Sequence, residues 1–232
     1  MEIDPLHKVK LGYLDNQISN KLYNLIFKRF TIVKEGVSRI EYTTNIKFPF
    51  FYIEPNLLVS YSSLDVTEYG VLFARTVPII DLDNKLNIII QIMAPLVAYG
   101  TKSSIYAILG HEFLHYLHLL SKINRMNIVS DNRSSNFYEC IYEDQNHLVD
   151  AKKVFNNDKI LLHYITNKFE DGFKDSTLEK RVVQKWVNAG LPIRKIKIED
   201  NNIKIPFEYI LNFSLNSNLR EKLMSFEEKC NK

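Results

Sequence analysis

The sequence predicts an α+β fold in which a mixed β-sheet packs on a buried helix and an α-rich C-terminal part contains a β-hairpin. Three observations favour this class. Strand-like stretches gather in the N-terminal half, one apolar segment near the middle has helical composition, and helical periodicity dominates the remainder. The 232 residues suit a single domain, or a core over 1–156 followed by a C-terminal subdomain over 157–232.

The N-terminal half begins with a helical pattern over 16–30. Runs rich in β-branched and aromatic residues then predict strands at 38–42, 48–53, 57–61, 69–76 and 86–93. The last run, from Leu86 to Met93, is almost entirely apolar, which is typical of a buried strand. A connection that contains Pro95 leads from it into the central helix.

The central helix is predicted from Ser103 or Ser104, either of which is a suitable N-cap, through Leu120. The segment has one glycine, no proline and apolar residues on most sides, so we expect it to be buried. Within it lies the pentapeptide His111-Glu112-Phe113-Leu114-His115.

Histidines four residues apart lie on one face of a helix, where two imidazole nitrogens can reach one zinc ion. Glu112 is turned about 100° from His111, beside the metal, where its carboxylate can act as general base toward a water molecule. The pattern therefore predicts a Zn²⁺ site for amide hydrolysis. The alternative is a pair of core histidines and a solvated glutamate, but burying these groups unpaired would cost about 1–3 kcal/mol each.

A strand followed by a helix that carries His111-Glu112-Phe113-Leu114-His115 resembles the zincin metallopeptidases. Among them it is most similar to the gluzincin-type minimal domains, in which an edge strand precedes the motif helix. The resemblance covers about residues 70–156 and is specific at the five motif residues. It implies a zincin-like fold and a zinc-dependent peptidase, a hydrolase that acts on a protein or peptide substrate.

A catalytic zinc usually has three protein ligands. His118 lies about 10.5 Å along the helix axis from His111 and cannot join it on an unbroken helix. Residues 135–151 predict a second helix, and the resemblance implies a glutamate ligand from it, best matched by Glu143. Glu139, His147 and Asp144 remain alternatives. The candidate donors for a tetrahedral oxyanion are Tyr138, Tyr142, His163 and Tyr164, and the sequence singles out none of them.

The C-terminal third predicts helices at 159–169 and 177–189, the second ending at Gly190. Alternating residues at 195–198 and 203–205 flank a polar turn at 200–202, which indicates a hairpin. An amphipathic helix over 219–229 completes the chain.

Composition favours a soluble, cytoplasmic protein. Cys140 and Cys230 form no disulfide framework, the N-terminus has no signal-peptide core, and the longest apolar run, 86–99, is too short for a bilayer. A formal charge of +3 with scattered basic residues predicts neither a nucleic-acid nor a membrane partner, and it leaves the oligomeric state open.

Two other functions are compatible with the motif. One is a non-catalytic zinc-binding regulator or interaction protein, although such a protein would have no need of Glu112. The other is a repressor-cleaving or DNA-linked protease, because the motif also resembles the ImmA/IrrE-type families. Leu114 departs from the glycine usual in those families, and no helix-turn-helix pattern is present in the sequence.

Overall fold

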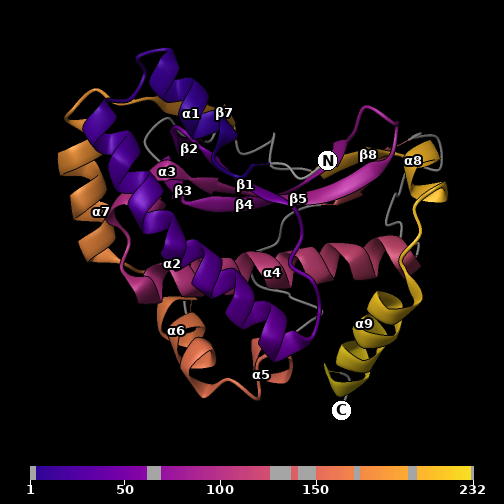
Figure 1. The fold of residues 1–232 in the computed structure, drawn as a ribbon. Helices are drawn as coiled ribbons and strands as arrows, with labels where there is room; N and C mark the ends of the chain where they lie inside the picture. The colour runs from indigo at the N-terminus through magenta and orange to yellow at the C-terminus, as the bar shows by residue number, and fades with distance from the viewer. Residues whose placement is uncertain are drawn as a thin grey trace.

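The computed structural model of the protein describes residues 4–61, 69–125, 137–140, 150–169, 173–197 and 203–230, and within these ranges the fold is α+β (Figure 1). The helices are α1 (His7–Leu14), α2 (Asn20–Thr44), α3 (Ala94–Tyr99), α4 (Lys102–Arg125), α5 (Ala151–Val154), α6 (Lys159–Phe169), α7 (Ser176–Val182), the π-helical turn η1 (Val183–Val187), α8 (Phe207–Leu211) and α9 (Ser217–Cys230). The strands are β1 (Phe51–Glu54), β2 (Leu57–Tyr61), β3 (Tyr69–Leu72), β4 (Ala74–Ile80), β5 (Leu86–Met93), β6 (Phe137–Cys140), β7 (Ile193–Lys197) and β8 (Ile203–Pro206).

A mixed three-stranded sheet in the order β1-β5-β4 forms the upper layer of Figure 1. Strand β1 runs parallel to β5, and β4 runs antiparallel to it. Strand β5 has the bounds predicted from its apolar run, and it is the central strand. The central position agrees with the buried strand predicted for 86–93, and the edge strand beside the motif helix is β4. Two smaller sheets, β3-β2-β7 and β6-β8, complete the strand pairing within the described residues.

The motif helix α4 lies under this sheet, with α2 crossing it and α6 on the side away from the strands (Figure 1). Apolar side chains on several of its faces are buried, among them Ile105, Leu109, Phe113 and Leu117, so the buried central helix is confirmed. Its N-cap differs from the prediction. The Ser104 amide donates to Thr101 Oγ1 over 3.1 Å, and Ser103 and Ser104 lie inside the first turn.

Helix α2 contradicts the strand predicted at 38–42, because those residues continue the helix to Thr44. Ser38-Arg39-Ile40-Glu41-Tyr42 has strand-like composition, but Ile40 extends a stripe of buried residues with helical spacing. That stripe comprises Leu22, Ile26, Phe30, Val33, Gly36, Ile40 and Thr44. Packing against α3 and α4 therefore outweighs local strand propensity.

Two predictions in the second half of the chain are wrong. Residues 137–140, expected within a helix over 135–151, form β6 and pair with β8. The predicted hairpin does not form either, because β7 pairs in parallel with β2 and β8 pairs with β6. Its two arms bury different residues: Ile196 packs in a small cluster with Leu58 and Met93, whereas Ile205 enters the main core. Because the two strands bury their apolar side chains in different clusters, they pair in separate sheets.

Residues on both sides of position 157 contribute to the main core. Asp158 links the two parts directly, since its Oδ1 accepts a 2.7 Å hydrogen bond from Arg39 Nη2 on α2. The same oxygen accepts the Leu161 amide over 2.9 Å and so caps α6. The boundary at 156 stays a prediction, although α6 packs directly on α4.

The Asp158 ion pair predicts a pH-dependent stability term. The hydrogen bond from Arg39 holds the pKa of this carboxyl below its usual range. Its contribution is therefore complete above the unfolded-state pKa of about 3.9 and disappears as the pH falls through the lower folded-state pKa. We expect Asp158→Asn to lower the free energy of unfolding by about 1–3 kcal/mol at pH 7. Urea unfolding of both proteins should show this difference shrinking below about pH 4, and a pH-independent difference would contradict the assignment.

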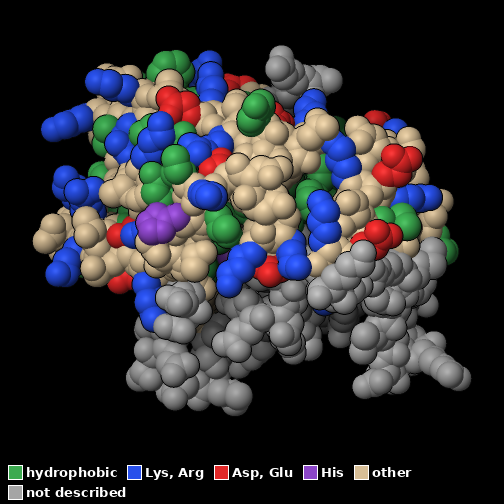
Figure 2. Space-filling model, turned by 90° about the horizontal axis from the view of Figure 1, so that it is seen from below, with side chains coloured by type: hydrophobic (Ala, Val, Ile, Leu, Met, Phe, Trp, Pro, Cys, Tyr) green, Lys and Arg blue, Asp and Glu red, His purple; other side chains and the backbone are tan. Residues whose placement is uncertain are grey.

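Charged side chains of both signs lie on the face of the molecule shown in Figure 2. Figure 2 shows Lys and Arg side chains spread over one face with Asp and Glu among them. Each helix within the described ranges is too short or too polar to cross a bilayer.

Candidate metal centre

His111 and His115 lie one turn apart on α4 and direct their rings toward each other. Their Nε2 atoms are 2.9 Å apart, within hydrogen-bond distance, and the ring planes are nearly perpendicular. Both nitrogens thus face the space between the two rings, where a metal ion bound by both would lie. Two Zn–N bonds of about 2.0–2.1 Å at a tetrahedral angle separate the nitrogens by about 3.3 Å, so small ring rotations would suffice. The two histidines therefore fit zinc.

Helix α6 reaches the centre because α4 has a glycine immediately before the first histidine. A Cβ atom at Gly110 would lie 2.6 Å from Ile165 Cδ1, which no ordinary contact allows. The close approach brings the end of α6 to the motif, where the Phe169 ring stacks on His111 at a centroid distance of 3.9 Å and an interplanar angle of 6°. This stack restricts rotation of the His111 ring.

Glu112 is buried, with 6% of its surface exposed, and faces the edge strand β4. Thr76 on that strand places its hydroxyl 2.9 Å from Glu112 Oε2 and 3.0 Å from the Glu112 backbone oxygen. His115 is buried to the same extent. A buried carboxylate and a buried imidazole thus lie three residues apart on α4, where interactions between charges are stronger than in water, and His111 is half-buried beside them.

The candidates for a third metal ligand are not described by the structure. Glu143, Asp144 and His147 fall in 141–149, outside the described residues, and the side chain of Glu139 on β6 is also undescribed. Within the described ranges, no three His, Cys, Asp or Glu side chains form a group that could hold a metal ion. Glu143 remains the predicted ligand, with Glu139, His147 and Asp144 as the alternatives.

The remaining sequence candidates have other surroundings. Helix α4 is continuous through Arg125, so His118 stays two turns from His111, as predicted. His163 is exposed on α6 and its Nε2 lies 3.0 Å from Asn167 Nδ2. Tyr164 packs edge-on against Tyr106. Tyr138 lies on β6 with an undescribed side chain, and Tyr142 is outside the described residues.

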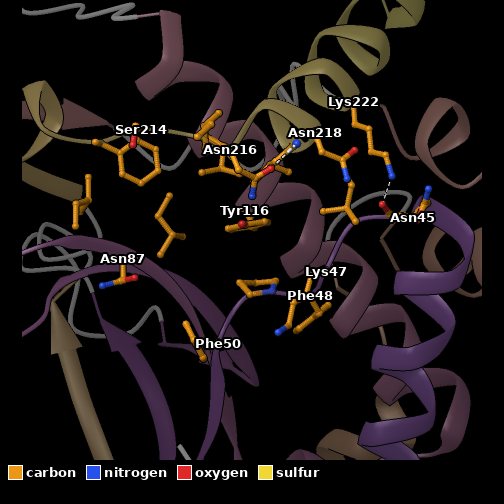
Figure 3. Close-up of a pocket in the computed structure, with 18 residues that line it drawn as sticks. Asn45, Lys47, Phe48, Phe50, Asn87, Tyr116, Ser214, Asn216, Asn218 and Lys222 are labelled. Atoms are coloured by element: carbon orange, nitrogen blue, oxygen red, sulfur yellow. Dashed lines mark hydrogen bonds between the residues drawn. The ribbon is translucent and has the colours of Figure 1, made fainter. Parts of the chain in front are cut away.

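A separate cavity of about 430 Å³ lies between the α2–β1 connection, the start of β5 and residues 213–222 (Figure 3). Tyr116 and Leu120 of α4 line it, whereas His111, Glu112 and His115 do not. Burial raises the pKa of Tyr116 to about 12, so this phenol stays neutral near pH 7. The cavity is therefore distinct from the histidine pair, although one helix supplies residues to both.

The sequence predicts the three motif residues as a site, and the structure adds two contacts that were not predicted, Thr76 on Glu112 and Phe169 on His111. A threonine at a buried position of an alternating strand is a weak sign of a polar partner on the facing element. Nothing local marks Phe169, because its contact depends on how α6 docks against α4.

Comparisons of the chain with protein-family profiles, with curated proteins and with solved structures yield no match, so the resemblance to zincins rests on the motif residues and their setting.

Proposed function

We propose that this protein is a zinc-dependent peptidase in which His111 and His115 bind the metal and Glu112 is the general base. The observation that carries the proposal is the convergence of the two Nε2 atoms, 2.9 Å apart, on a helix that also presents a buried carboxylate. Zinc sites in hydrolases are built from such imidazole pairs with one further protein ligand. We assign that third position to Glu143.

In this proposal the metal supplies Lewis acidity, which polarises a carbonyl and lowers the pKa of water to about 7. Glu112 would accept a proton from a water molecule as the water oxygen adds to the carbonyl carbon, and would return that proton to the amine nitrogen as the C–N bond breaks. Its burial, at 6% exposure, favours this role, because a shielded carboxylate exchanges protons with its immediate partners more readily than with bulk water. His111 and His115 act through their Nε2 atoms as neutral ligands, and Phe169 limits the orientations of the first ring.

An extended peptide is the substrate class that the surroundings favour. Strand β4 is at the edge of the sheet β1-β5-β4, and its residue Thr76 contacts the general base. Edge strands offer backbone donors and acceptors to an added strand, so a peptide aligned on β4 would pass beside Glu112.

The deciding experiment is the zinc content of the chain, measured by elemental analysis after purification without added metal or a histidine tag. We expect about one zinc per chain in the wild type and strong losses in His115→Ala and Glu143→Ala. His163→Ala is the matched control, because His163 is an exposed histidine on α6 that pairs with Asn167. It should retain wild-type zinc.

Two outcomes would change the proposal. A wild type that binds no zinc, even after reconstitution, would return His111 and His115 to the role of hydrogen-bonded core histidines. Full zinc occupancy in Glu143→Ala would move the third ligand to Glu139, His147 or Asp144. With zinc established, hydrolysis of unfolded protein substrates is the assay that tests peptidase activity.

A further inference from the structure

Thr76 occupies a buried position on the edge strand β4. Burial alternates along the first residues of this strand, with Ala74 and Thr76 buried and Arg75 half-buried between them. Arg75 pairs with Gln91 of the neighbouring strand β5, whereas Thr76 contacts α4. Thr76 is only 1% exposed, so its hydroxyl requires a protein partner.

Glu112 is a partner of Thr76, which contacts it at two atoms. The single hydroxyl hydrogen is shared, in a bifurcated hydrogen bond, between the backbone oxygen at 3.0 Å and carboxylate Oε2 at 2.9 Å. Both acceptors belong to Glu112, so the contact restricts the orientation of its side chain relative to its own backbone. Rotation of the carboxylate away from β4 would break the hydrogen bond to Oε2.

A purely structural role for Thr76 would require only the hydrogen bond to the backbone oxygen. Thr44 on α2 is a buried threonine whose hydroxyl donates to the Ile40 backbone oxygen over 2.8 Å and accepts the Ile46 amide over 3.2 Å, so both of these partners are backbone groups. The backbone oxygen of Glu112 could satisfy Thr76 in the same manner. The additional contact with the carboxylate is what distinguishes Thr76, and it involves the group that would transfer protons.

We infer that Thr76 is a positioning residue that holds the Glu112 carboxylate in the orientation required for proton transfer. The edge strand β4 would then contribute to the reaction through this one hydrogen-bonded side chain. The inference rests on the proposed function, since it assigns a partner to the proposed base. It assigns Thr76 no contact with substrate or metal.

The test compares Thr76→Val, which removes the hydroxyl at nearly constant shape, with Thr76→Ser, which keeps it. For the zinc-loaded protein we expect Thr76→Val to lower kcat by about 10- to 100-fold, because small misplacements of a reacting group have effects of this size. KM should change by less than about threefold and zinc content should be unchanged, because the substrate and metal contacts stay in place. Thr76→Ser should recover most of kcat.

Thr44→Val is the matched control, because it removes another buried, hydrogen-bonded threonine hydroxyl away from the motif. It should lower the unfolding midpoint about as much as Thr76→Val does and leave kcat unchanged. A second readout needs no activity. Crystals of the metal-free proteins should show the Glu112 carboxylate against β4 in the wild type and in Thr76→Ser, and rotated away in Thr76→Val.

The outcomes separate this inference from the proposed function. If Thr76→Val has the wild-type kcat while Glu112→Gln is inactive, the positioning role of Thr76 is wrong and the proposed peptidase function stands. An equal fall of kcat in Thr76→Val and Thr44→Val would also overturn it, because the loss would then follow stability. If the wild type shows no hydrolysis, the proposed function is wrong. If the Glu112 side chain has the same conformation in crystals of Thr76→Val as in the wild type, the positioning role is wrong whatever the activity.

Discussion

Glu112→Gln should retain zinc and lose hydrolysis. The change removes the basic carboxylate from the proposed proton transfer, a contribution typically worth about 10²- to 10⁴-fold in rate. The glutamine oxygen can still accept the hydrogen bond that Thr76 donates to Oε2. We therefore expect the fold and the histidine pair to be preserved, and kcat to carry almost the entire loss.

Zinc content and hydrolysis rates measured on the same preparations would check this expectation. Glu221→Gln is a suitable control, because Glu221 is an exposed glutamate on α9. Loss of zinc in Glu112→Gln would make Glu112 a ligand rather than a base. Hydrolysis at the wild-type rate would exclude it from proton transfer altogether.

The motif residues could be predicted because their geometry is local. His111, Glu112 and His115 lie on one helix, and the pitch of a helix fixes their relative directions wherever that helix packs. The same applies to β2 at 57–61, β5 at 86–93 and α6 at 159–169, which have the predicted bounds. Each is a short run with a clear pattern and polar or turn-forming neighbours.

Partners supplied by distant segments could not be predicted in this way. Thr76 reaches Glu112 through the docking of β4 on α4, and Phe169 reaches His111 through the docking of α6. The false hairpin at 195–205 has the same cause. Its alternating residues indicate two strands correctly, but the choice of β2 and β6 as partners depends on which core each strand can enter.

The strand predicted at 38–42 failed for a related reason. Ile40 and Tyr42 favour a strand locally, yet Gly36 sits where α2 crosses α4, and a Cβ atom there would lie 2.8 Å from Leu109 Cδ1. Ile40, one turn beyond this crossing, is completely buried, so the helical stripe keeps its packing through the segment. Tertiary packing thus decides the conformation of a segment whose own propensity points elsewhere.

Trp186→Ala should produce the largest loss of stability in the C-terminal third. Trp186 is completely buried in η1, packs edge-on against Tyr99 of α3 and donates through Nε1 to the Pro192 oxygen over 2.9 Å. Truncation of a buried tryptophan to alanine typically costs about 3–5 kcal/mol. Val183→Ala is the control, because Val183 lies on the same turn with 51% of its surface exposed, and its change should stay within about 0.5 kcal/mol.

Calorimetry of Trp186→Ala would also test how the chain is divided. Tyr99 precedes position 157 and Trp186 follows it, and both belong to or pack against the same hydrophobic core. If this core folds as one unit, the variant should show a single transition at lower temperature, with equal calorimetric and van't Hoff enthalpies. If 157–232 is an independent subdomain, two transitions should separate, with only one shifted by the substitution. With an independent subdomain, the zinc binding proposed for His111 and His115 would survive the first transition. With a single unit, bound metal and fold would be lost together.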